Sequence, residues 1–345
     1  MKKIGLRIIV LCLLVGMSSC ERALMVDDLH GTPTNTFGYL WKRFDEQYSM
    51  FDVKGVDWGA MYDSLAPLVH DTMSDDSLFA VCASLLNSLR DGHVNLYGTY
   101  DASRSDSIYY RFYAESDIDA GVVVLNYMGL DYRQTGSLAH AGLCGDSVIY
   151  VRYASFGNAV DEGRLRHLLR SYPDARGMIF DIRGNGGGAI ENIHHLLALM
   201  PSHGQPLYYT QIKSGPGHDD FGPLEVCRAP VAEAGDPDIF RKPVVVLIDR
   251  GCFSAASSFA ICTQAYDNMV LMGNSTSGGL GLPSMGVLPN GWRYRLSVTR
   301  TLALDGGNYE NGVPPDIPLR LDWDRARREG RDNIIDSACA WIMNQ

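Results

Sequence analysis

The sequence predicts an α/β fold for residues 145–325, because apolar strands and helices alternate along this part of the chain. Two runs are almost wholly apolar, as strands covered on both faces by helices are. A third run is rich in β-branched and aromatic residues, which strands prefer. The expected strands lie at 147–153, 177–182 and 243–248, and the expected helices at 190–200 and 255–266.

A small helical subdomain is expected before this core, at residues 37–100. Apolar side chains recur there at the spacing of a helix face, first in the run from Phe37 to Tyr48 and again in two later runs. Residues 101–144 are predicted to connect the two parts as a β-rich segment, with strands at 108–113 and 121–125. A C-terminal helix is expected at 326–345.

The composition excludes several classes of protein. Of the 345 residues, 46% are apolar and 20% are charged, which is typical of a globular protein rather than a disordered one. Thirty basic and 40 acidic residues give a net charge of −10. Removal of the three cations before residue 20 would leave 27 − 40 = −13. Because nucleic-acid phosphates would be repelled by such a chain, nucleic acid is not expected as a partner.

Residues 1–19 have the pattern of a secretory signal peptide. A basic start is followed by an apolar run from Ile8 to Val15, which is too short to span a bilayer. The run ends in Met-Ser-Ser-Cys, which resembles the lipobox of bacterial lipoproteins and implies acylation of Cys20. We therefore expect a membrane-anchored lipoprotein of the bacterial cell envelope, on the outer membrane or periplasmic face, with residues 20–36 as a tether. The alternative is a plain signal peptide with an incidental cysteine.

The remaining cysteines do not predict a metal site. Six cysteines follow Cys20, at positions 82, 144, 227, 252, 262 and 339. No Cys-x-x-Cys pair occurs and none of these six lies within three residues of a histidine, so zinc binding is unsupported. Disulfides are compatible with export, but the sequence does not pair these cysteines.

Three motifs could carry chemistry. The first is a Gly-rich segment at the end of a buried strand, the second a strand-to-helix turn that contains Ser254, and the third an Arg-Asp-Gly-His turn that ends at His93. A serine at a strand-to-helix turn can present its hydroxyl beside helix N-terminal amides. Glycines at the end of the neighbouring strand allow a backbone N–H to approach. Together these features indicate a nucleophile and an oxyanion hole, with His93 as the candidate base.

Each motif alone has a simpler interpretation. A serine at a helix start is more often a cap, and a histidine after a helix is more often a capping residue. The three glycines at 186–188 resemble a phosphate cradle, but neither a GxGxxG motif nor the lysine and Ser/Thr of a P-loop is present.

In combination and order, the motifs resemble the tail-specific or C-terminal processing serine peptidases, most closely the branch that includes the tricorn core protease. The matching segments are FGYLWKRFDEQY at 37–48, LRDGH at 89–93, VIYVRYASF at 148–156, GMIFDIRGNGGG at 177–188, VVVLIDRGCFSAAS at 244–257 and YENGVPPDI at 309–317. The resemblance implies a ClpP/crotonase-like core of repeated ββα units behind the helical subdomain. It also implies Ser254 as nucleophile, His93 as base and Glu310 as the acidic member. The implied oxyanion hole combines the Ala255 amide with one from the Gly186–Gly187 turn.

The chain departs from the family in three places. Gly279 stands where the processing peptidases carry their catalytic lysine, and no lysine follows Lys242. Serine stands at 257 and 258, where relatives often carry glutamate. Only about 50 residues separate Gly98 from Val148, too few for the peptide-binding PDZ domain that many relatives insert. The base is therefore expected to be His93, whose unperturbed pKa of about 6.5 suits catalysis near neutrality.

These observations predict an exported, lipid-anchored serine endopeptidase that acts on peptides or unfolded proteins through an acyl-enzyme. No cofactor or metal is implied. The alternative is an inactive lipoprotein of the same fold that binds a peptide or an apolar ligand, since the same core carries retinoid elsewhere in the wider family.

Overall fold

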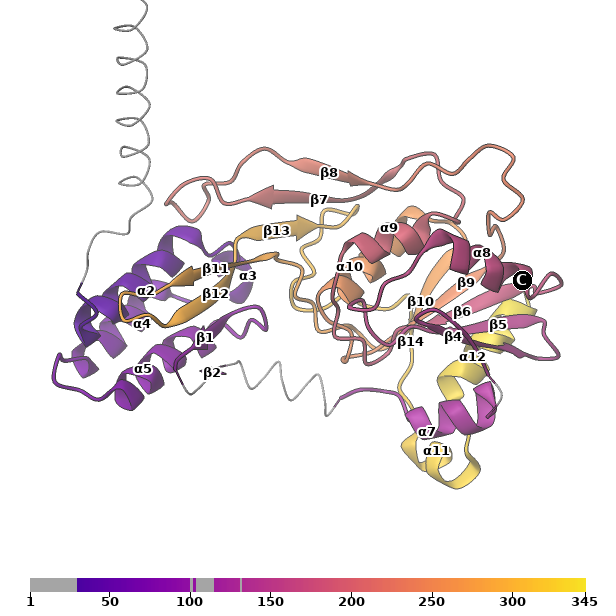
Figure 1. Cartoon of the computed structure of the whole chain (residues 1–345), viewed down its shortest axis with the longest axis horizontal. Helices are drawn as coiled ribbons and strands as arrows, with labels where there is room; N and C mark the ends of the chain where they lie inside the picture. The colour runs from indigo at the N-terminus through magenta and orange to yellow at the C-terminus, as the bar shows by residue number, and fades with distance from the viewer. Residues whose placement is uncertain (1–29, 100–101, 104–114, 131) are drawn as a thin grey trace, which may run out of the picture.

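The computed structural model describes residues 30–99, 102–103, 115–130 and 132–345. Its largest element is a seven-stranded sheet in the order β14-β10-β9-β6-β5-β4-β3 (Figure 1). The five strands from β14 to β5 are parallel, and β4 and β3 continue the sheet antiparallel. Its strands are β3 (Arg133–Thr135), β4 (Leu138–Leu143), β5 (Val148–Arg152), β6 (Gly177–Asp181), β9 (Val244–Ile248), β10 (Met269–Gly273) and β14 (Ile317–Pro318).

Helices cover both faces of this sheet because its central strands are apolar on both sides. In β9, Val244, Val246 and Ile248 belong to one hydrophobic core, whereas Val245 and Leu247 belong to another. The first core is covered by α8 (Glu162–Arg170), α9 (Glu191–Leu197) and α10 (Ala255–Cys262), which continues as η3 (Thr263–Ala265), and the second mainly by α12 (Asn333–Met343) with α11 (Trp323–Glu329). The predicted α/β core is confirmed. The single helix expected at 326–345 is instead two helices, because Gly330, which has a left-handed backbone conformation, caps the end of α11, and α12 begins at Asn333.

The N-terminal subdomain combines helices with a four-stranded sheet in the order β11-β12-β1-β2. Its elements are α2 (Pro33–Gln47), α3 (Phe51–Lys54), α4 (Trp58–Leu65), η1 (Ala66–Leu68), α5 (Asp75–Asn87), β1 (Asn95–Tyr97), β2 (Ala102–Ser103), β11 (Pro283–Val287) and β12 (Arg293–Ser297). Two of these strands come from within the predicted core segment, and their Trp292, Tyr294 and Leu296 pack into the core of the N-terminal helices. The hairpin at 283–297 thus belongs structurally to the N-terminal subdomain.

A long hairpin runs beside both parts of the molecule (Figure 1). It consists of β7 (Pro206–Ile212) and β8 (Glu225–Arg228), and β13 (Thr299–Leu302) completes its three-stranded sheet. In the connection between β7 and β8, His218 pairs with Asp45 at 2.9 Å and stacks on Phe51. The hairpin therefore links the core to the N-terminal helices.

One predicted element type and one predicted boundary were also wrong. The run at 121–125 was expected as a strand but is helical, as α7 (Ala120–Val122) followed by η2 (Val123–Met128). Asp119 caps this helix by accepting a hydrogen bond from the Val122 N–H, and Val123 and Met128 pack into the second core. Helix α2 begins at Pro33, inside the predicted tether, because Thr32 caps it and proline suits the first helical position.

Other predictions fall outside the described residues. These are the strand at 108–113, the signal peptide and Cys20. Among the residues that the structure describes, no helix is both long and apolar enough to cross a membrane.

A buried ion cluster holds the carboxyl end of β6 against the start of α12. Arg183 is fully buried, and its guanidinium donates to Asp181 at 2.7 Å and to Asp332 at 2.9 Å. It also donates to the backbone carbonyl of Asp117. These bonds pair the buried charges, without which their burial would be very unfavourable.

Replacement of Arg183 by leucine should destabilise the fold strongly. Two buried carboxylates would lose their cation, which costs about 3–5 kcal/mol when a buried pair is broken. Urea unfolding followed by circular dichroism measures the change in free energy of unfolding. Arg164→Leu is the control, because that arginine pairs with Asp161 and both side chains are more than half exposed, so it should cost less than about 1 kcal/mol. Equal stability of Arg183→Leu and the unmodified protein would contradict this account.

Candidate active site

The Gly-rich segment and the Ser254 turn meet because they follow neighbouring parallel strands. β6 ends at Asp181 and β9 at Ile248, and the two strands pair in parallel, so both turns leave the same edge of the sheet. The buried Asp249 joins the turns by accepting hydrogen bonds from the N–H groups of Gly184 at 2.8 Å and Gly251 at 2.9 Å. This arrangement brings the Gly-rich loop against the serine.

Ser254 is held in an unusual backbone conformation directly before α10. Its φ is +55° and its ψ −123°, a region that residues with a side chain rarely adopt. The Ser254 N–H donates to the Gly278 carbonyl at 2.9 Å. Its hydroxyl does not cap the helix but lies 3.1 Å from His93 Nε2. The capping interpretation of Ser254 is therefore not supported by the geometry.

His93 is buried and is oriented through both ring nitrogens. Its Nδ1 lies 2.8 Å from the carbonyl oxygen of Gly281, which can only accept, so Nδ1 carries the proton. Nε2 is then the unprotonated nitrogen, and the Ser254 hydroxyl donates to it. This tautomer is the one that can remove a proton from Ser254.

Asp91 fixes the backbone of the histidine turn. Its carboxylate accepts from the His93 N–H at 2.7 Å, from the Tyr48 hydroxyl at 3.0 Å and from the Ser297 hydroxyl at 2.9 Å. Tyr48 follows α2 and Ser297 ends β12, so Asp91 ties the turn to two other segments of the N-terminal subdomain.

Burial lowers the pKa of His93 to about 4, and Arg295 and Lys54 act in the same direction. The negative charge of Asp91 and the bond to Gly281 oppose this shift without reversing it. His93 is therefore neutral at pH 7 and can act as a base over a wider acidic range than its unperturbed pKa of about 6.5 implied.

Glu310 is buried near His93 but acts on it through the backbone. Its Oε2 accepts from the N–H groups of Leu280 at 2.7 Å and Gly281 at 3.0 Å. The carbonyl of that same Gly281 accepts from His93 Nδ1. Glu310 thus holds the peptide segment that orients the imidazole, and it has no direct hydrogen bond to the imidazole in the described structure.

A buried ion pair completes this arrangement. Lys54 Nζ lies 3.5 Å from Glu310 Oε1, and both side chains are at most 3% exposed. Burial and the Asp91 charge raise the pKa of Glu310 to about 7, whereas Lys54 and the two N–H bonds oppose the increase. Lys54 also donates to Asn311 and to the carbonyl of Arg90.

The Gly-rich loop lies close enough to Ser254 to contribute an amide. A Cβ on Gly187 would lie 2.8 Å from the Ser254 Cβ and 2.6 Å from the Phe253 carbonyl oxygen, so only glycine fits. The Gly187 N–H already donates to the Asn185 side chain at 2.9 Å. Within the described part of the chain, the N–H groups of Gly186 and Ala255 have no acceptor. Of the three predicted oxyanion residues, Gly186 and Ala255 are thus the ones that could donate to a substrate.

Phe253 occupies the space beside Gly279, the position at which the sequence was found to depart from the lysine-dependent pattern. A Cβ on Gly279 would lie 2.2 Å from the Phe253 ring, and the φ of Gly279 is +74°. The same ring packs 4.9 Å from the His93 ring. The Phe253 ring therefore fills the space that a side chain at position 279 would need. His93, and not a residue at position 279, lies within hydrogen-bond distance of Ser254.

Other candidate groups lie apart from this arrangement. Ser257 is fully buried and donates to Thr276 at 2.9 Å, so it does not face the site. Across the described residues, no group of three or more His, Cys, Asp or Glu side chains could hold a metal ion.

Sequence reasoning missed Lys54, Asp91 and Gly281. Asp91 could have been found, because an aspartate two residues before His93 can accept its backbone N–H. Lys54 and Gly281 carry no such local signal, since they reach the site from distant parts of the sequence.

The low pKa of His93 predicts the pH dependence of Ser254 labelling by a fluorophosphonate probe. Protonation of His93 should change the labelling rate little between pH 7 and pH 5.5, because the imidazole stays largely neutral in this range. The rate should fall as the pH approaches about 4. Circular dichroism at each pH restricts the comparison to folded protein. A decrease near pH 7 that disappears in Glu310→Gln would belong to Glu310. A decrease near pH 6.5 that persists in this variant would contradict the lowered pKa.

Comparison with known proteins identifies a family and a fold to which the chain is similar. Residues 147–319 match the model of peptidase family S41, and residues 32–87 match the tricorn protease C1 domain. A solved structure of a candidate peptidase from Parabacteroides merdae ATCC 43184 is 32% identical, with a TM-score of 0.84 over 90% of this chain and 96% of that one. Mature CPAF has a TM-score of 0.64 at 12% identity, covering 91% of this chain and 98% of its own, and so shares the fold.

A curated relative supports the same family. The carboxy-terminal processing protease CtpA of Bacillus subtilis (strain 168) is 27% identical over 148 residues, which are 43% of this chain. The match spans only 29% of the length of CtpA. The family model covers half of this chain, including Ser254, Glu310 and the Gly-rich loop, and the chain therefore belongs to peptidase family S41, a family of serine-type peptidases.

Proposed function

We propose that this protein is a serine endopeptidase that cleaves peptides or unfolded proteins, with Ser254 as nucleophile and His93 as general base. The observation that carries the proposal is the 3.1 Å contact between Ser254 Oγ and His93 Nε2, together with the Gly281 carbonyl that selects the tautomer. A binding protein would not need a buried neutral imidazole aimed at a serine in a strained conformation.

The reaction follows from the positions of these groups. Ser254 Oγ attacks the scissile carbonyl as its proton moves to His93 Nε2. The N–H groups of Gly186 and Ala255 hold the oxyanion of the tetrahedral intermediate. His93 then donates this proton to the leaving amine, which leaves an acyl-enzyme on Ser254. Water, deprotonated by His93, hydrolyses the ester and restores the enzyme.

Replacement of Ser254 or His93 by alanine should abolish turnover of an unfolded protein substrate. Loss of either member of such a unit costs on the order of 10⁶ in kcat. Release of fluorescent peptides from a labelled casein measures the loss, and fluorophosphonate labelling with peptide mapping identifies the nucleophile. Ser258→Ala, one helical turn away, is the matched control and should remain active. Retained turnover in Ser254→Ala would rule out the proposal, and peptide binding without any turnover in the unmodified protein would favour the ligand-binding alternative.

Lys54 is a positioning residue in this proposal, because it neutralises the carboxylate that holds Gly281. Lys54→Met should lower kcat about tenfold at pH 7 with little change in KM. Without the cation, the pKa of Glu310 should rise further, so activity should recover as the pH is raised and the carboxylate forms again. Lys42→Met, on the surface of α2 with a side chain that is 68% exposed, is the control. A parallel loss at every pH would indicate a purely structural role.

We further propose export and lipid anchoring through Cys20, which the lipobox-like boundary supports. Cys20→Ser should release the protein from the membrane pellet into the soluble fraction of the producing bacterium. Immunoblots of the two fractions measure the release, and mass spectrometry of the mature N-terminus tests for the acyl group. A mature chain that still contains Met1–Cys20 would contradict lipid anchoring but would leave the peptidase proposal intact.

A further inference from the structure

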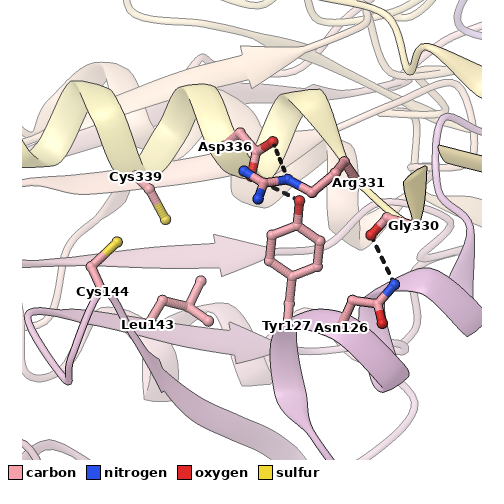
Figure 2. A pocket seen from close by; sticks show the side chains of 8 residues that line it. All are labelled: Asn126, Tyr127, Leu143, Cys144, Gly330, Arg331, Asp336 and Cys339. Atoms are coloured by element: carbon pink, nitrogen blue, oxygen red, sulfur yellow. Dashed lines mark hydrogen bonds and ion pairs between the residues drawn. The ribbon is translucent and has the colours of Figure 1, made fainter. Parts of the chain in front are cut away.

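Two cysteines from distant parts of the core face each other beside a cavity on the side of the sheet covered by α12. Cys144 lies in the turn between β4 and β5, and Cys339 lies on α12. Figure 2 shows their sulfur atoms pointing toward one another across the gap between these two elements. Both cysteines also line this cavity.

The two thiols differ in their access to solvent. Cys144 is exposed, whereas Cys339 is half-buried. The adjoining cavity has a volume of about 370 Å³ and is lined in part by Tyr127, Leu143 and Asp336. A small oxidant can therefore reach the Cys144 sulfur and leave Cys339 as the resolving thiol.

The other cysteines do not offer an equivalent pair. Cys82, Cys252 and Cys262 are buried in apolar or hydrogen-bonded surroundings. Cys227 is half-buried, and its Sγ lies 3.9 Å from His194 Nε2.

We propose that Cys144 and Cys339 form a disulfide when the protein meets a dithiol-oxidising disulfide, such as oxidised glutathione or the disulfide of an envelope oxidoreductase. The Cys144 thiolate attacks the oxidant and releases one thiol, and Cys339 then attacks the mixed disulfide and releases the second. Two electrons and two protons pass from the cysteines to the oxidant. That the protein meets such an oxidant in the cell depends on the proposed export. The reaction between the two thiols and the oxidant does not depend on it.

The disulfide would tie α12 to the sheet over a large part of the chain. It links positions 195 residues apart (339 − 144), so it restricts the unfolded state strongly. Asp332, which caps the start of α12, binds Arg183 next to the Gly-rich loop. The cross-link would therefore hold α12 against the sheet, and the start of α12 is bonded to Arg183 beside the Gly-rich loop.

The test is to oxidise the purified full chain with oxidised glutathione, block free thiols with N-ethylmaleimide and digest without reduction. We expect a linked peptide pair containing Cys144 and Cys339 that separates on reduction. Alkylation of both cysteines after equilibration, a glutathione adduct that stays on Cys144, or a link of either residue to Cys227 would overturn the proposal.

Thermal unfolding provides a second measurement. Oxidation should raise the apparent midpoint by roughly 5 °C in the unmodified protein. This increase should vanish in Cys144→Ser and persist in Cys227→Ser, the matched control. An equal increase in all three proteins would also overturn the proposal. Because Ser254 labelling is measured separately, failure of the disulfide proposal is distinguishable from failure of the peptidase proposal.

Discussion

The antiparallel pairing of β1 with β12 is the constraint on which the site depends. β1 begins two residues after His93, and its Asn95 pairs with Arg295 of a hairpin that leaves and re-enters the core segment. The chain that leads into this hairpin passes the imidazole at Gly281. The base and the nucleophile come from different subdomains, so they meet only when this strand pairing is formed.

Burial is the main cause of the low pKa of His93 and therefore keeps its imidazole neutral at pH 7. A directly contacting carboxylate would raise the pKa of the imidazole, whereas here the contact is a peptide carbonyl and the pKa falls to about 4. Glu310 supports that peptide through two N–H groups, and Lys54 balances its charge. The imidazole of His93 is consequently neutral and can accept the proton of Ser254. Glu310 acts on it only indirectly, because the Gly281 peptide lies between the two side chains.

The parts of the fold that sequence predicted well are those in which hydrophobic pattern alone decides. The runs at 177–182 and 243–248 are apolar on both faces, which favours buried strands, and they form β6 and β9. The run at 121–125 has the same composition, but Asp119 caps it as a helix that needs only one buried face. β-Branched composition cannot distinguish these outcomes, because the packing partner decides between them. For the same reason, the N-terminal location of the 283–297 hairpin could not be read from its own residues.

The sequence by itself determined the chemistry that this chain can offer at the carboxyl edge of its sheet. A serine at a strand-to-helix turn, a Gly-rich loop after the neighbouring strand and the lack of lysine after Lys242 are local facts, and parallel strand order makes the first two meet. Tertiary structure alone decided which groups surround the histidine. Lys54, Glu310 and Gly281 are distant from one another in sequence and meet only in the fold, where the Lys54 and Glu310 side chains are at most 3% exposed. Burial is a property of the whole fold, so the direction in which the pKa of His93 moves could not be known before the fold was.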